Sequence, residues 1–332
     1  MEKNLKNKVV FITGGSRGIG LAIALRAAAD GAKVIIAAKT VTEQPTLPGT
    51  IYTACDAVRA AGGEALAVPL DVRDEAQIVA AINKAVETFG GIDILVNNAG
   101  AIRLSDTPST ESKHYDLMHA INMRAVFLLA RHALPYLRKS DNGHILNLSP
   151  PLNLHPGWFK RHVAYTLSKY GMSLTTLGLA AEFEPYGIKV NSLWPETTID
   201  TSAVRNKLGG ESVAKMSRRP EIVAEAAWHI FTDRTPANTG CFHIDTAVLR
   251  KAGVTDFAAY SCEPGATLMP DFFLGEPPAS LSGLLDKKQP FGQPNSQTYR
   301  QPYRQPPTLS GYLLVGALAL LAFGLGCFLV FG

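Results

Sequence analysis

Cysteine is scarce in this chain of 332 residues, and its placement suggests neither a metal site nor a disulfide framework. The four cysteines are Cys55, Cys241, Cys262 and Cys327, and no two of them have the close spacing of paired metal ligands. The eight histidines likewise follow no recognisable metal spacing. We therefore predict no metal site, and a reducing compartment in which thiols stay free.

A clear excess of one sign of charge is also missing from most of the sequence. The formal net charge is +4, from 32 Lys and Arg against 28 Asp and Glu, but residues 286–304 alone hold four basic residues and one acidic residue. Residues 1–285 therefore sum to only +1. We expect no nucleic-acid-binding domain, because such domains carry a clear basic surplus. No apolar run precedes Val9, so we expect no secretory signal either.

A long apolar run stands at the C-terminal end of the sequence. Residues 312–332 are 21 positions without a charge, and as a helix they would cross the ~30 Å hydrocarbon layer of a bilayer. We predict a transmembrane anchor over residues 309–332, with a buried core helix as the alternative. Residues 286–308 are rich in proline and regularly spaced glutamine, which is typical of a linker. The basic residues of this linker suit either solubility or anionic lipid headgroups. Their position predicts a tail-anchored membrane protein with residues 1–285 on the cytoplasmic side.

Upstream of the linker, short β-branched runs alternate with helical patterns. We expect strands over residues 9–13, 33–38, 65–70, 94–96, 144–148, 189–193 and 241–244. The segments between them carry apolar residues three and four positions apart, which is the spacing of amphipathic helices. This alternation predicts an α/β fold, a doubly wound parallel sheet of the Rossmann type, in a single domain over residues 1–285.

A glycine-rich segment, TGGSRGIG at residues 13–20, follows the first predicted strand. Its glycines permit a tight turn and close approach of the backbone to a pyrophosphate, and the next helix would present its N-terminal amides. The spacing is not that of the G-x-G-x-x-G fingerprint, so an ordinary glycine turn is the alternative. The expected dinucleotide contacts in this segment are Gly14, Ser16, Arg17, Gly18, Ile19 and Gly20.

The end of the second predicted strand lacks the carboxylate that would hold the ribose of NAD. Residues 37–40 read Ala-Ala-Lys-Thr, and Lys39 would lie near Arg17 of the glycine-rich segment. These two cations, with no carboxylate beside them, favour binding of NADP(H), which carries a 2′-phosphate, over NAD(H). The alternative is that one or both cations simply face solvent.

Tyr165 and Lys169 lie four residues apart in a helical pattern, so their side chains share one face of the helix. A lysine ammonium near a phenol favours the phenolate, which lowers the tyrosine pKa and prepares it for proton transfer. Such pairs are common on ordinary helices, and this one gains interest from its position. It follows the strand that leads into Ser149, which places Ser149 at the carboxyl edge of the sheet, where open α/β folds bind ligands.

These motifs together resemble the short-chain dehydrogenase/reductase family over about residues 8–245. The matching features are the TGGSRGIG segment, the sequence NNAG at residues 97–100, Ser149, and the pair Tyr165 and Lys169. Three further stretches, residues 49–54, 146–160 and 270–274, are similar to the dehydrogenase half of hydroxysteroid-dehydrogenase-like proteins.

The resemblance implies a role for each matching residue. Tyr165 would give or take the proton of the reaction, Lys169 would bind the nicotinamide ribose and lower the tyrosine pKa, and Ser149 would hydrogen-bond the substrate oxygen. Asn122 would help to hold a proton-relay water. The further cofactor contacts that the family implies are Asp71 and Val72 at the adenine, Asn98, Ala99 and Gly100 along the cofactor, and Thr197 or Thr201 at the carboxamide. Asn98 could alternatively serve only to brace the central strand.

The sequence departs from the family pattern in three places. Ser149 precedes Tyr165 by 16 positions, a few more than is usual, and the apolar loop between them either walls a greasy substrate or simply packs. Glu196 replaces the usual glycine after the sixth predicted strand. Asp-Thr-Ala at residues 245–247 replaces the Asp-Gly-Gly expected after the last strand.

The sequence therefore predicts a membrane-tethered, NADP-dependent oxidoreductase that interconverts a secondary alcohol and a ketone on a small lipophilic substrate, such as an acyl derivative or a steroid-like compound. The alternative, which the change at Glu196 favours, is an NADP(H)-binding scaffold or sensor without turnover. Members of the family commonly pair through helices that here span about residues 112–138 and 163–184, so a homo-oligomer is expected.

Overall fold

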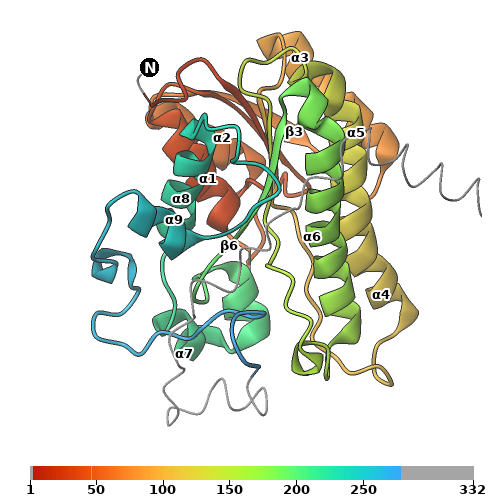
Figure 1. Cartoon of the computed structure of the whole chain (residues 1–332), viewed down its shortest axis with the longest axis vertical. Helices are drawn as coiled ribbons and strands as arrows, with labels where there is room; N and C mark the ends of the chain where they lie inside the picture. Colours follow the sequence, from red (N-terminus) through yellow and green to blue (C-terminus); the bar gives the residue numbers. More distant parts are fainter. Residues whose placement is uncertain (1–2, 46, 278–332) are drawn as a thin grey trace, which may run out of the picture. The chain divides into compact units, whose positions relative to one another are not determined.

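Seven parallel strands of the computed structural model form one sheet, which lies between two layers of helices (Figure 1). The structure describes residues 3–45 and 47–277. The strand order across the sheet is β3-β2-β1-β4-β5-β6-β7. The strands are β1 (Val9–Thr13), β2 (Lys33–Ala38), β3 (Glu64–Pro69), β4 (Ile94–Asn97), β5 (His144–Asn147), β6 (Lys189–Trp194) and β7 (Phe242–Ile244).

The helices cover both faces of this sheet (Figure 1). One layer holds α1 (Gly18–Ala28), α2 (Ile51–Ala60), α8 (Glu221–Thr232) and α9 (Asp245–Lys251). The other holds α3 (Glu75–Phe89), α4 (Ser112–His119), α5 (Ala125–Leu137) and α6 (Val163–Phe183). Successive strand residues point to opposite faces, so Val10 and Ile12 enter the core under α1 whereas Phe11 enters the core under α5.

Two of these helices begin at side-chain caps. Thr50 Oγ1 accepts hydrogen bonds from the amides of Tyr52 and Thr53, both at 3.2 Å, and α2 starts directly after it. Asp74 caps α3 in the same way. Helix α1 has no side-chain cap, so its first amides stay open to a ligand.

The strand order reverses between β1 and β4, where the two halves of the sheet meet. Parallel pairing brings the carboxyl ends of the central strands to one edge, since Val96 of β4 lies beside Ile12 of β1 and Leu146 of β5. Asn147 of β5 in turn lies beside Ser192 of β6. Ligands of open α/β folds bind at such a reversal, outside the carboxyl ends of the strands.

These observations confirm the predicted fold class. The seven predicted strands begin and end within one residue of the observed ones, because short apolar runs between turn signals mark buried parallel strands clearly. The pattern did not predict α7 (Gly210–Lys215) or α9, which starts at Asp245 directly after β7.

The predicted linker and anchor, residues 286–308 and 309–332, lie outside the described residues. Across residues 3–45 and 47–277, no helix combines the length and the apolar character needed to cross a membrane. The tether therefore remains a prediction from the sequence.

Candidate active site

The loop between β1 and α1 is shaped by its glycines and braced by one asparagine. Gly14 and Gly18 have φ values of 65° and 56°, which residues with side chains rarely adopt. A Cβ on Gly20 would come within 2.5 Å of Asn98 Nδ2. That amide nitrogen donates to the carbonyls of Thr13 at 2.9 Å and Gly14 at 3.0 Å. The loop thus keeps its backbone accessible at the start of α1, as a pyrophosphate site requires.

The other contacts predicted in this region gather around the same loop. Ser16 is buried and Ile19 is half-buried. Thr13 Oγ1 accepts hydrogen bonds from the amides of Asn98 and Ala99, each at 3.1 Å, which ties the end of β1 to the segment after β4. Gly100, at the end of that segment, is exposed. These observations show the bracing role considered for Asn98.

A cavity of about 340 Å³ opens beside the start of α1. Its lining includes Arg17 and Gly18 from the glycine loop, Pro48 from the connection before α2, and Thr201 and Arg205 from the segment after β6. Thr201 Cγ2 would lie 3.3 Å from a Cβ on Gly18. The cavity thus lies next to the accessible backbone of the glycine loop.

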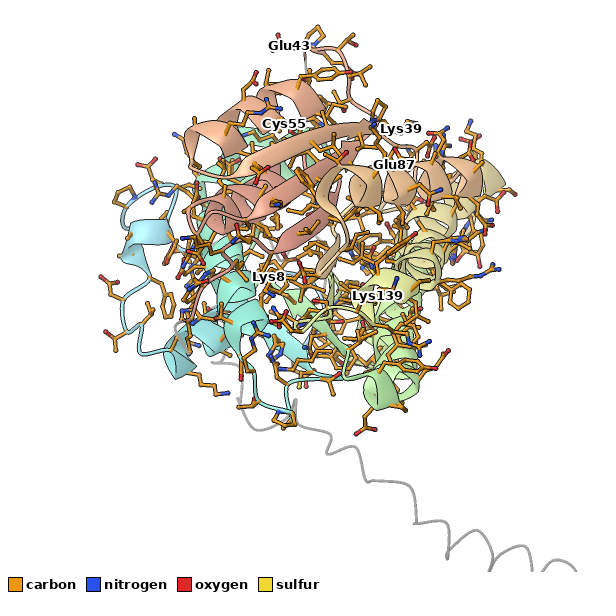
Figure 2. The ribbon with its side chains drawn as sticks, turned by 90° about the horizontal axis from the view of Figure 1, so that it is seen from above. Lys8, Lys39, Glu43, Cys55, Glu87 and Lys139 are labelled. Carbon is orange, nitrogen blue, oxygen red and sulfur yellow. The ribbon has the colours of Figure 1, made fainter. Side chains whose placement is uncertain are left out.

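The two cations predicted to bind a 2′-phosphate lie in different surroundings. The Arg17 guanidinium is engaged, since it donates to the carbonyls of Pro48 at 3.0 Å and Gly49 at 2.6 Å. Lys39 lies at the surface in Figure 2, with Glu43 farther along the same connection, and its side chain is 62% exposed. Arg17, predicted to lie near Lys39, therefore also has a structural role, because its hydrogen bonds hold the chain between β2 and α2.

Asp71, predicted to contact the adenine, is paired with cations instead of standing free. Its carboxylate receives hydrogen bonds from the Arg73 guanidinium and lies 3.1 Å from Lys39 Nζ. Hydrogen bonds from Arg73, and then the Lys39 ammonium, hold the pKa of Asp71 well below its usual range. Val72 beside it is buried. The carboxylate is therefore neutralised by neighbours at the edge where the adenosine half of a dinucleotide would lie.

Tyr165 and Lys169 are both buried on α6, with 5% and 8% of their surface exposed. Lys169 Nζ donates to Leu148 O at 2.6 Å, and it lies 4.9 Å from the centroid of the Trp194 ring. Burial lowers the pKa of Lys169 to about 8. Lys169 therefore lies beside the carboxyl end of β5 and reaches the residue before Ser149, while Tyr165 lies one helical turn earlier on the same face of α6.

The pKa of Tyr165 corrects one expectation from the sequence. The helical spacing predicts a tyrosine pKa lowered by Lys169, but burial raises the pKa of Tyr165, and the charge of Asp271 adds to this rise. The physical reason is that enclosure removes the hydration of a phenolate. The ammonium of Lys169, meanwhile, hydrogen-bonds the backbone carbonyl of Leu148.

Ser149 ends a chain of buried hydrogen bonds that crosses three strands and α6. Its Oγ lies 2.8 Å from Ser192 Oγ, which lies 2.8 Å from Thr176 Oγ1. Thr176 accepts from Asn147 Nδ2 at 2.8 Å, and Asn147 Oδ1 accepts from Asn97 Nδ2 at 2.8 Å. Sequence reasoning missed Ser192 and Thr176 as parts of the site. A usable signal existed, because Thr176 follows Lys169 by seven positions and so shares its helix face.

Asn122 lies in a π-helical stretch, Ala120–Arg124, between α4 and α5. Its Nδ2 donates to Ala101 O and to Ser168 Oγ, both at 2.9 Å, while its Oδ1 accepts from the Ala101 amide. Ser168 in turn donates to Tyr165 O at 2.8 Å. The side chain of Asn122 therefore joins the segment after β4 to α6, and the π-helical turn sets it at a point that commonly marks functional sites.

Glu196 is accommodated in the turn after β6. Its carboxylate lies 3.0 Å from Arg218 Nη1 and 3.5 Å from Arg250 Nη1, and its amide donates to Asp245 Oδ1 at 2.9 Å. These ion pairs engage the side chain of Glu196, which stands where the family pattern has glycine. Thr197 beside it is buried, and its Oγ1 has no hydrogen-bond partner among the described residues. This orphaned hydroxyl fits a carboxamide, which can both donate and accept.

Aromatic rings from two distant segments surround the pair on α6. The Phe273 centroid lies 6.2 Å from that of Tyr165 and 5.7 Å from that of Trp158, which belongs to the long loop before α6. The same loop is fixed to α6, because Ser173 Oγ donates to Pro150 O at 2.6 Å. The loop therefore packs on the helix and contributes to an apolar wall. The sequence singled out residues 270–274 only by resemblance and predicted no role for them in the active site.

The part of the chain that the structure describes contains no cluster of side chains suited to a metal ion. No group of three or more His, Cys, Asp or Glu side chains in residues 3–45 and 47–277 could hold a metal ion. His162, near the site, instead places its Nδ1 2.9 Å from Thr166 Oγ1, and burial lowers its pKa.

Comparisons with known proteins agree with this geometry. The family model for short chain dehydrogenases matches residues 8–211. Hydroxysteroid dehydrogenase-like protein 2 of Xenopus laevis is 54% identical over 278 residues, or 84% of this chain, and its Danio rerio counterpart is 57% identical over 272 residues, or 82%. The chain spans 66% and 65% of those two relatives. A solved Xanthomonas campestris structure, described provisionally as a dehydrogenase, is 52% identical with a TM-score of 0.80 and covers 82% of this chain and 100% of its own.

Proposed function

Because the chain belongs to the short-chain dehydrogenase/reductase family and is an oxidoreductase, we propose that it interconverts a secondary alcohol and a ketone. The observation that carries this proposal is that Lys169, one helical turn after Tyr165 on α6, reaches the end of β5 directly before Ser149. Lys169 Nζ donates to the carbonyl of the residue before Ser149 at 2.6 Å, so the helix that carries Tyr165 meets the strand end that leads to Ser149. These are the groups that proton transfer to a carbonyl oxygen needs.

Members of this family bind NAD(P)(H), and the residues present fit such a cofactor. The accessible glycine backbone at Gly14 and Gly18 would hold the pyrophosphate, and the orphaned Thr197 hydroxyl would meet the carboxamide. When bound, the nicotinamide supplies or accepts the hydride. The chain's own groups do the rest: Ser149 holds the substrate oxygen, Tyr165 moves its proton, and Lys169 keeps the site positively charged.

NADP(H) is the proposed cofactor within this class. Support comes from the end of β2, where Lys39 takes the place of an acid, and from Arg73, which neutralises Asp71 nearby. A 2′-phosphate would meet cations there and no free carboxylate. The test is fluorescence titration of the full chain with NADPH and with NADH. Tighter binding of NADH would overturn this preference.

A small lipophilic substrate is favoured by the surroundings of Tyr165. Phe272 and Phe273 from the C-terminal part and Trp158 from the long loop are buried around the site. Such a wall favours apolar groups next to the reacting carbon. The names of the curated relatives agree with a steroid-like class, and an acyl derivative suits the same wall.

Membrane attachment is proposed from the sequence of residues 309–332 alone. Together with the basic linker, it would give a tail-anchored protein with its folded part on the cytoplasmic side. The test compares the full chain with a chain that ends at residue 285 by carbonate extraction of cell membranes. The full chain should resist extraction and the shorter chain should not. Extraction of both would remove the anchor from the proposal.

A homo-oligomer is proposed from an exposed apolar surface. Large apolar side chains on α4, α5, α6 and the π-helical stretch are 42% to 56% exposed, namely Tyr115, Met123, Phe127, Leu167 and Leu174. Such surfaces mark protein interfaces. Light scattering of the full chain in detergent should give at least a dimer, and Phe127→Glu with Leu174→Glu should give a monomer. A wild-type monomer would contradict the proposal.

The test of the central proposal is NADPH consumption by the full chain. The substrates offered are 3-ketoacyl thioesters, steroid ketones, and small ketones and aldehydes, with Tyr165→Phe as the inactive variant. Turnover that disappears in the variant supports the proposal and identifies the substrate class. Tight NADPH binding with no turnover on any substrate would instead favour a nucleotide-binding scaffold or sensor.

A further inference from the structure

Two of the departures from the family pattern meet in the structure. Glu196, in the turn after β6, stands where the family has glycine, and residues 245–247 at the start of α9 stand where it has Asp-Gly-Gly. The Glu196 amide donates to Asp245 Oδ1 at 2.9 Å, and the Thr246 amide donates to the same oxygen at 2.7 Å. Asp245 therefore ties the turn after β6 to the first residues of α9.

The Glu196 side chain is held by two arginines. Its Oε2 lies 3.0 Å from Arg218 Nη1, and its Oε1 lies 3.5 Å from Arg250 Nη1. The side chains of Arg218 and Glu196 are only 8% and 17% exposed, so water screens their attraction little. Arg250 Nη1 also donates to Thr246 Oγ1 at 3.3 Å, an oxygen that a glycine would lack. Arg250 thus bonds the side chains of both departures from the family pattern.

Arg218 contacts the residues on both sides of Thr197. Besides its ion pair with Glu196, its backbone amide donates to Thr198 O at 3.0 Å. The Asp271 amide donates to Glu196 O at 3.1 Å, from a segment far along the chain. Bonds to the residue before Thr197 and to the residue after it therefore fix the backbone at this position.

The side chain of Thr197 is buried within this fixed turn. Its Oγ1 has no hydrogen-bond partner among the described residues. A buried hydroxyl without a partner lowers stability, so a turn that keeps one in place suits a hydroxyl reserved for a ligand. Under the proposed function, that ligand is the nicotinamide carboxamide, which can both donate and accept.

We propose that Glu196 is a positioning residue, whose ion pair with Arg218 holds the turn after β6 so that the Thr197 hydroxyl meets the nicotinamide carboxamide. This inference deepens the proposed function and rests on it, because it concerns the nicotinamide half of the cofactor. Glu196 acts through the turn and need not touch the cofactor. A carboxylate with its arginine partners thereby does the work of the family glycine, so this departure preserves the binding of the nicotinamide.

The test measures the affinity for the two halves of the cofactor and needs no turnover. The full chain is titrated with the reduced cofactor, followed by nicotinamide fluorescence. The same cofactor without its nicotinamide, which is ADP-ribose or its 2′-phosphate, is then measured by displacement. Glu196→Gln keeps the shape of the side chain and removes its charge. It should raise the dissociation constant of the reduced cofactor about tenfold and that of the fragment by less than about twofold, because the fragment has no carboxamide.

Glu225→Gln is the matched control for this experiment. Glu225 on α8 also pairs with an arginine, since Arg26 Nε lies 2.6 Å from its Oε2, but Arg26 lies in the last turn of α1, far from the turn after β6. Its variant should leave both dissociation constants unchanged. An equal rise for both ligands in Glu196→Gln would reduce the ion pair to a structural role. No rise for either would show that the turn holds without the pair, and each of these two results overturns the inference.

A double-mutant cycle tests whether Glu196 acts through Thr197. Thr197→Val removes the hydroxyl and leaves the ion pair, so it should also weaken binding of the reduced cofactor and spare the fragment. When Glu196→Gln and Thr197→Val are combined, the two losses should not add, because both remove the same contact. Additive losses would overturn the inference. If urea unfolding shows that Glu196→Gln does not fold, Arg218→Lys takes its place, because lysine keeps the charge but lacks the planar guanidinium.

Ketone turnover, measured in parallel, distinguishes this inference from the proposed function. A selective loss of affinity for the reduced cofactor in Glu196→Gln, with no turnover by the wild type on any ketone, would sink the proposed function alone. Turnover by the wild type without that selective loss would sink the role of Glu196 alone. A wild type that binds no reduced cofactor would contradict both.

Discussion

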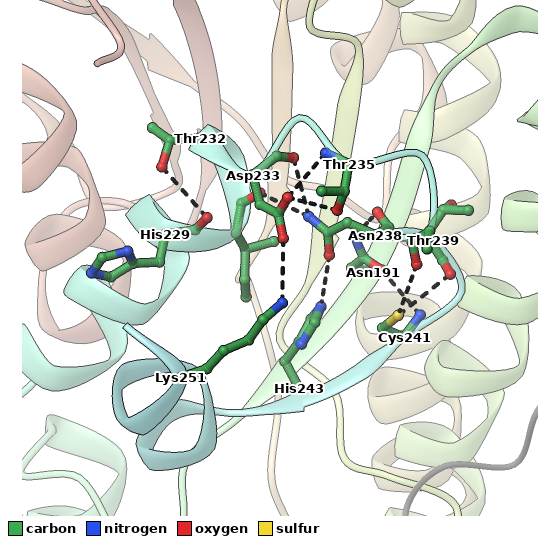
Figure 3. A network of polar contacts seen from close by, with 12 residues as sticks. Asn191, His229, Thr232, Asp233, Thr235, Asn238, Thr239, Cys241, His243 and Lys251 are labelled. Carbon is green, nitrogen blue, oxygen red and sulfur yellow. Dashed lines mark hydrogen bonds and ion pairs between the residues drawn. The ribbon is translucent and has the colours of Figure 1, made fainter. Parts of the chain in front are cut away.

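The two edges of the sheet differ in the task of their buried polar groups, although among the described residues each keeps an unpaired atom, such as His144 Nδ1 at the amino edge. At the amino edge, polar side chains around the start of β6 and β7 bond to one another and to nearby carbonyls (Figure 3). Asn191 Nδ2 donates to Asn238 O at 2.9 Å, and its Oδ1 accepts from the Cys241 amide at 3.0 Å. Asn238 also meets His243 Nε2 at 3.1 Å. These bonds join β6 and β7 to the loop that follows α8.

At the carboxyl edge, polar groups of the site stay incompletely paired. Thr197, Arg218 and Asp245 each keep a buried polar atom that has no hydrogen-bond partner among the described residues. Burial raises the pKa of Asp245 and of Asp271 to about 7. Such groups cost stability unless a ligand completes their environment, so they mark functional sites. The amino edge therefore supports the fold, whereas the carboxyl edge is prepared for binding and proton transfer.

Replacing Tyr165 at the carboxyl edge should change activity strongly and leave stability almost unchanged. Tyr165→Phe should lower ketone turnover by about 10²- to 10⁴-fold, because the proton of the reaction loses its carrier. The ring that packs on Phe273 remains, so the free energy of unfolding should change little. The measurement pairs initial rates of NADPH oxidation with urea unfolding. Tyr186→Phe, the same exchange at a site that is 43% exposed, should keep both values. Retained turnover in Tyr165→Phe would contradict the assignment.

Acid should lower the stability of the fold through a buried histidine at the amino edge. His144 is fully buried, and Asn191 Nδ2 lies 3.1 Å from its Nε2. Burial lowers the pKa of His144 to about 3. The unfolded chain, with a histidine pKa near 6.5, therefore binds the proton first, and stability is lost as pH falls below that value. Between pH 7 and pH 5 this loss is about 2 kcal/mol for His144.

The carboxyl edge should respond to acid with the opposite sign. Because the pKa of Asp245 is raised to about 7, its folded form takes up the proton first and gains stability as pH falls from 7 toward 4. His144→Gln should therefore lose less stability between pH 7 and pH 5 than the wild type, and Asp245→Asn should lose more. Urea unfolding at both pH values measures this. The same pH dependence in all three chains would refute the contrast between the edges.

The third prediction concerns the hydrogen bonds that lead to Ser149. Ser192→Ala removes the hydroxyl between Thr176 and Ser149, which lie 2.8 Å from it on either side. Ser149 then loses its fixed orientation, so turnover should fall about tenfold, with a stability loss of about 1 to 2 kcal/mol. Thr232→Ala is the matched control, because Thr232 is also buried and donates a hydrogen bond to Trp228 O at 2.9 Å, but lies on α8. An equal loss of turnover in both would leave Ser192 without a role in the site.

Most of the fold could be predicted from sequence, because its signals are local. The runs at residues 9–13 and 33–38 have the bounds of β1 and β2 as observed, since β-branched residues between turns read directly as buried strands. Tyr165 and Lys169 could be paired by helical spacing, and Ser149 could be placed by the end of its strand. Helix α9 escaped prediction because its stability comes from packing on α8, which no local pattern records.

Much of the remaining site depends on contacts between segments distant in the sequence. Ser192 reads as one residue of a buried strand, and only the pairing of β5 with β6 brings it to Ser149. Asp271 lies more than a hundred positions after Tyr165, in a segment with no helical or strand pattern. Arg17 could be predicted as a cation at the loop, but its partners at residues 47–49 depend on how a long connection folds back.

At the same carboxyl edge, we expect only a small change when Lys39 is replaced. Lys39 is 62% exposed and lies 3.1 Å from Asp71, so its charge acts through a well-hydrated contact worth about 1 kcal/mol or less. Lys39→Ala should therefore weaken NADPH binding only several-fold, and it should leave NADH binding unchanged because NADH has no 2′-phosphate. Titration at low and high salt should show the difference shrinking as salt screens the charge. Lys139→Ala, which removes another exposed lysine, should affect neither cofactor. If Lys39→Ala weakens both cofactors equally, then Lys39 contributes to the fold of the β2 connection, and phosphate selectivity must come from Arg17 or Arg73.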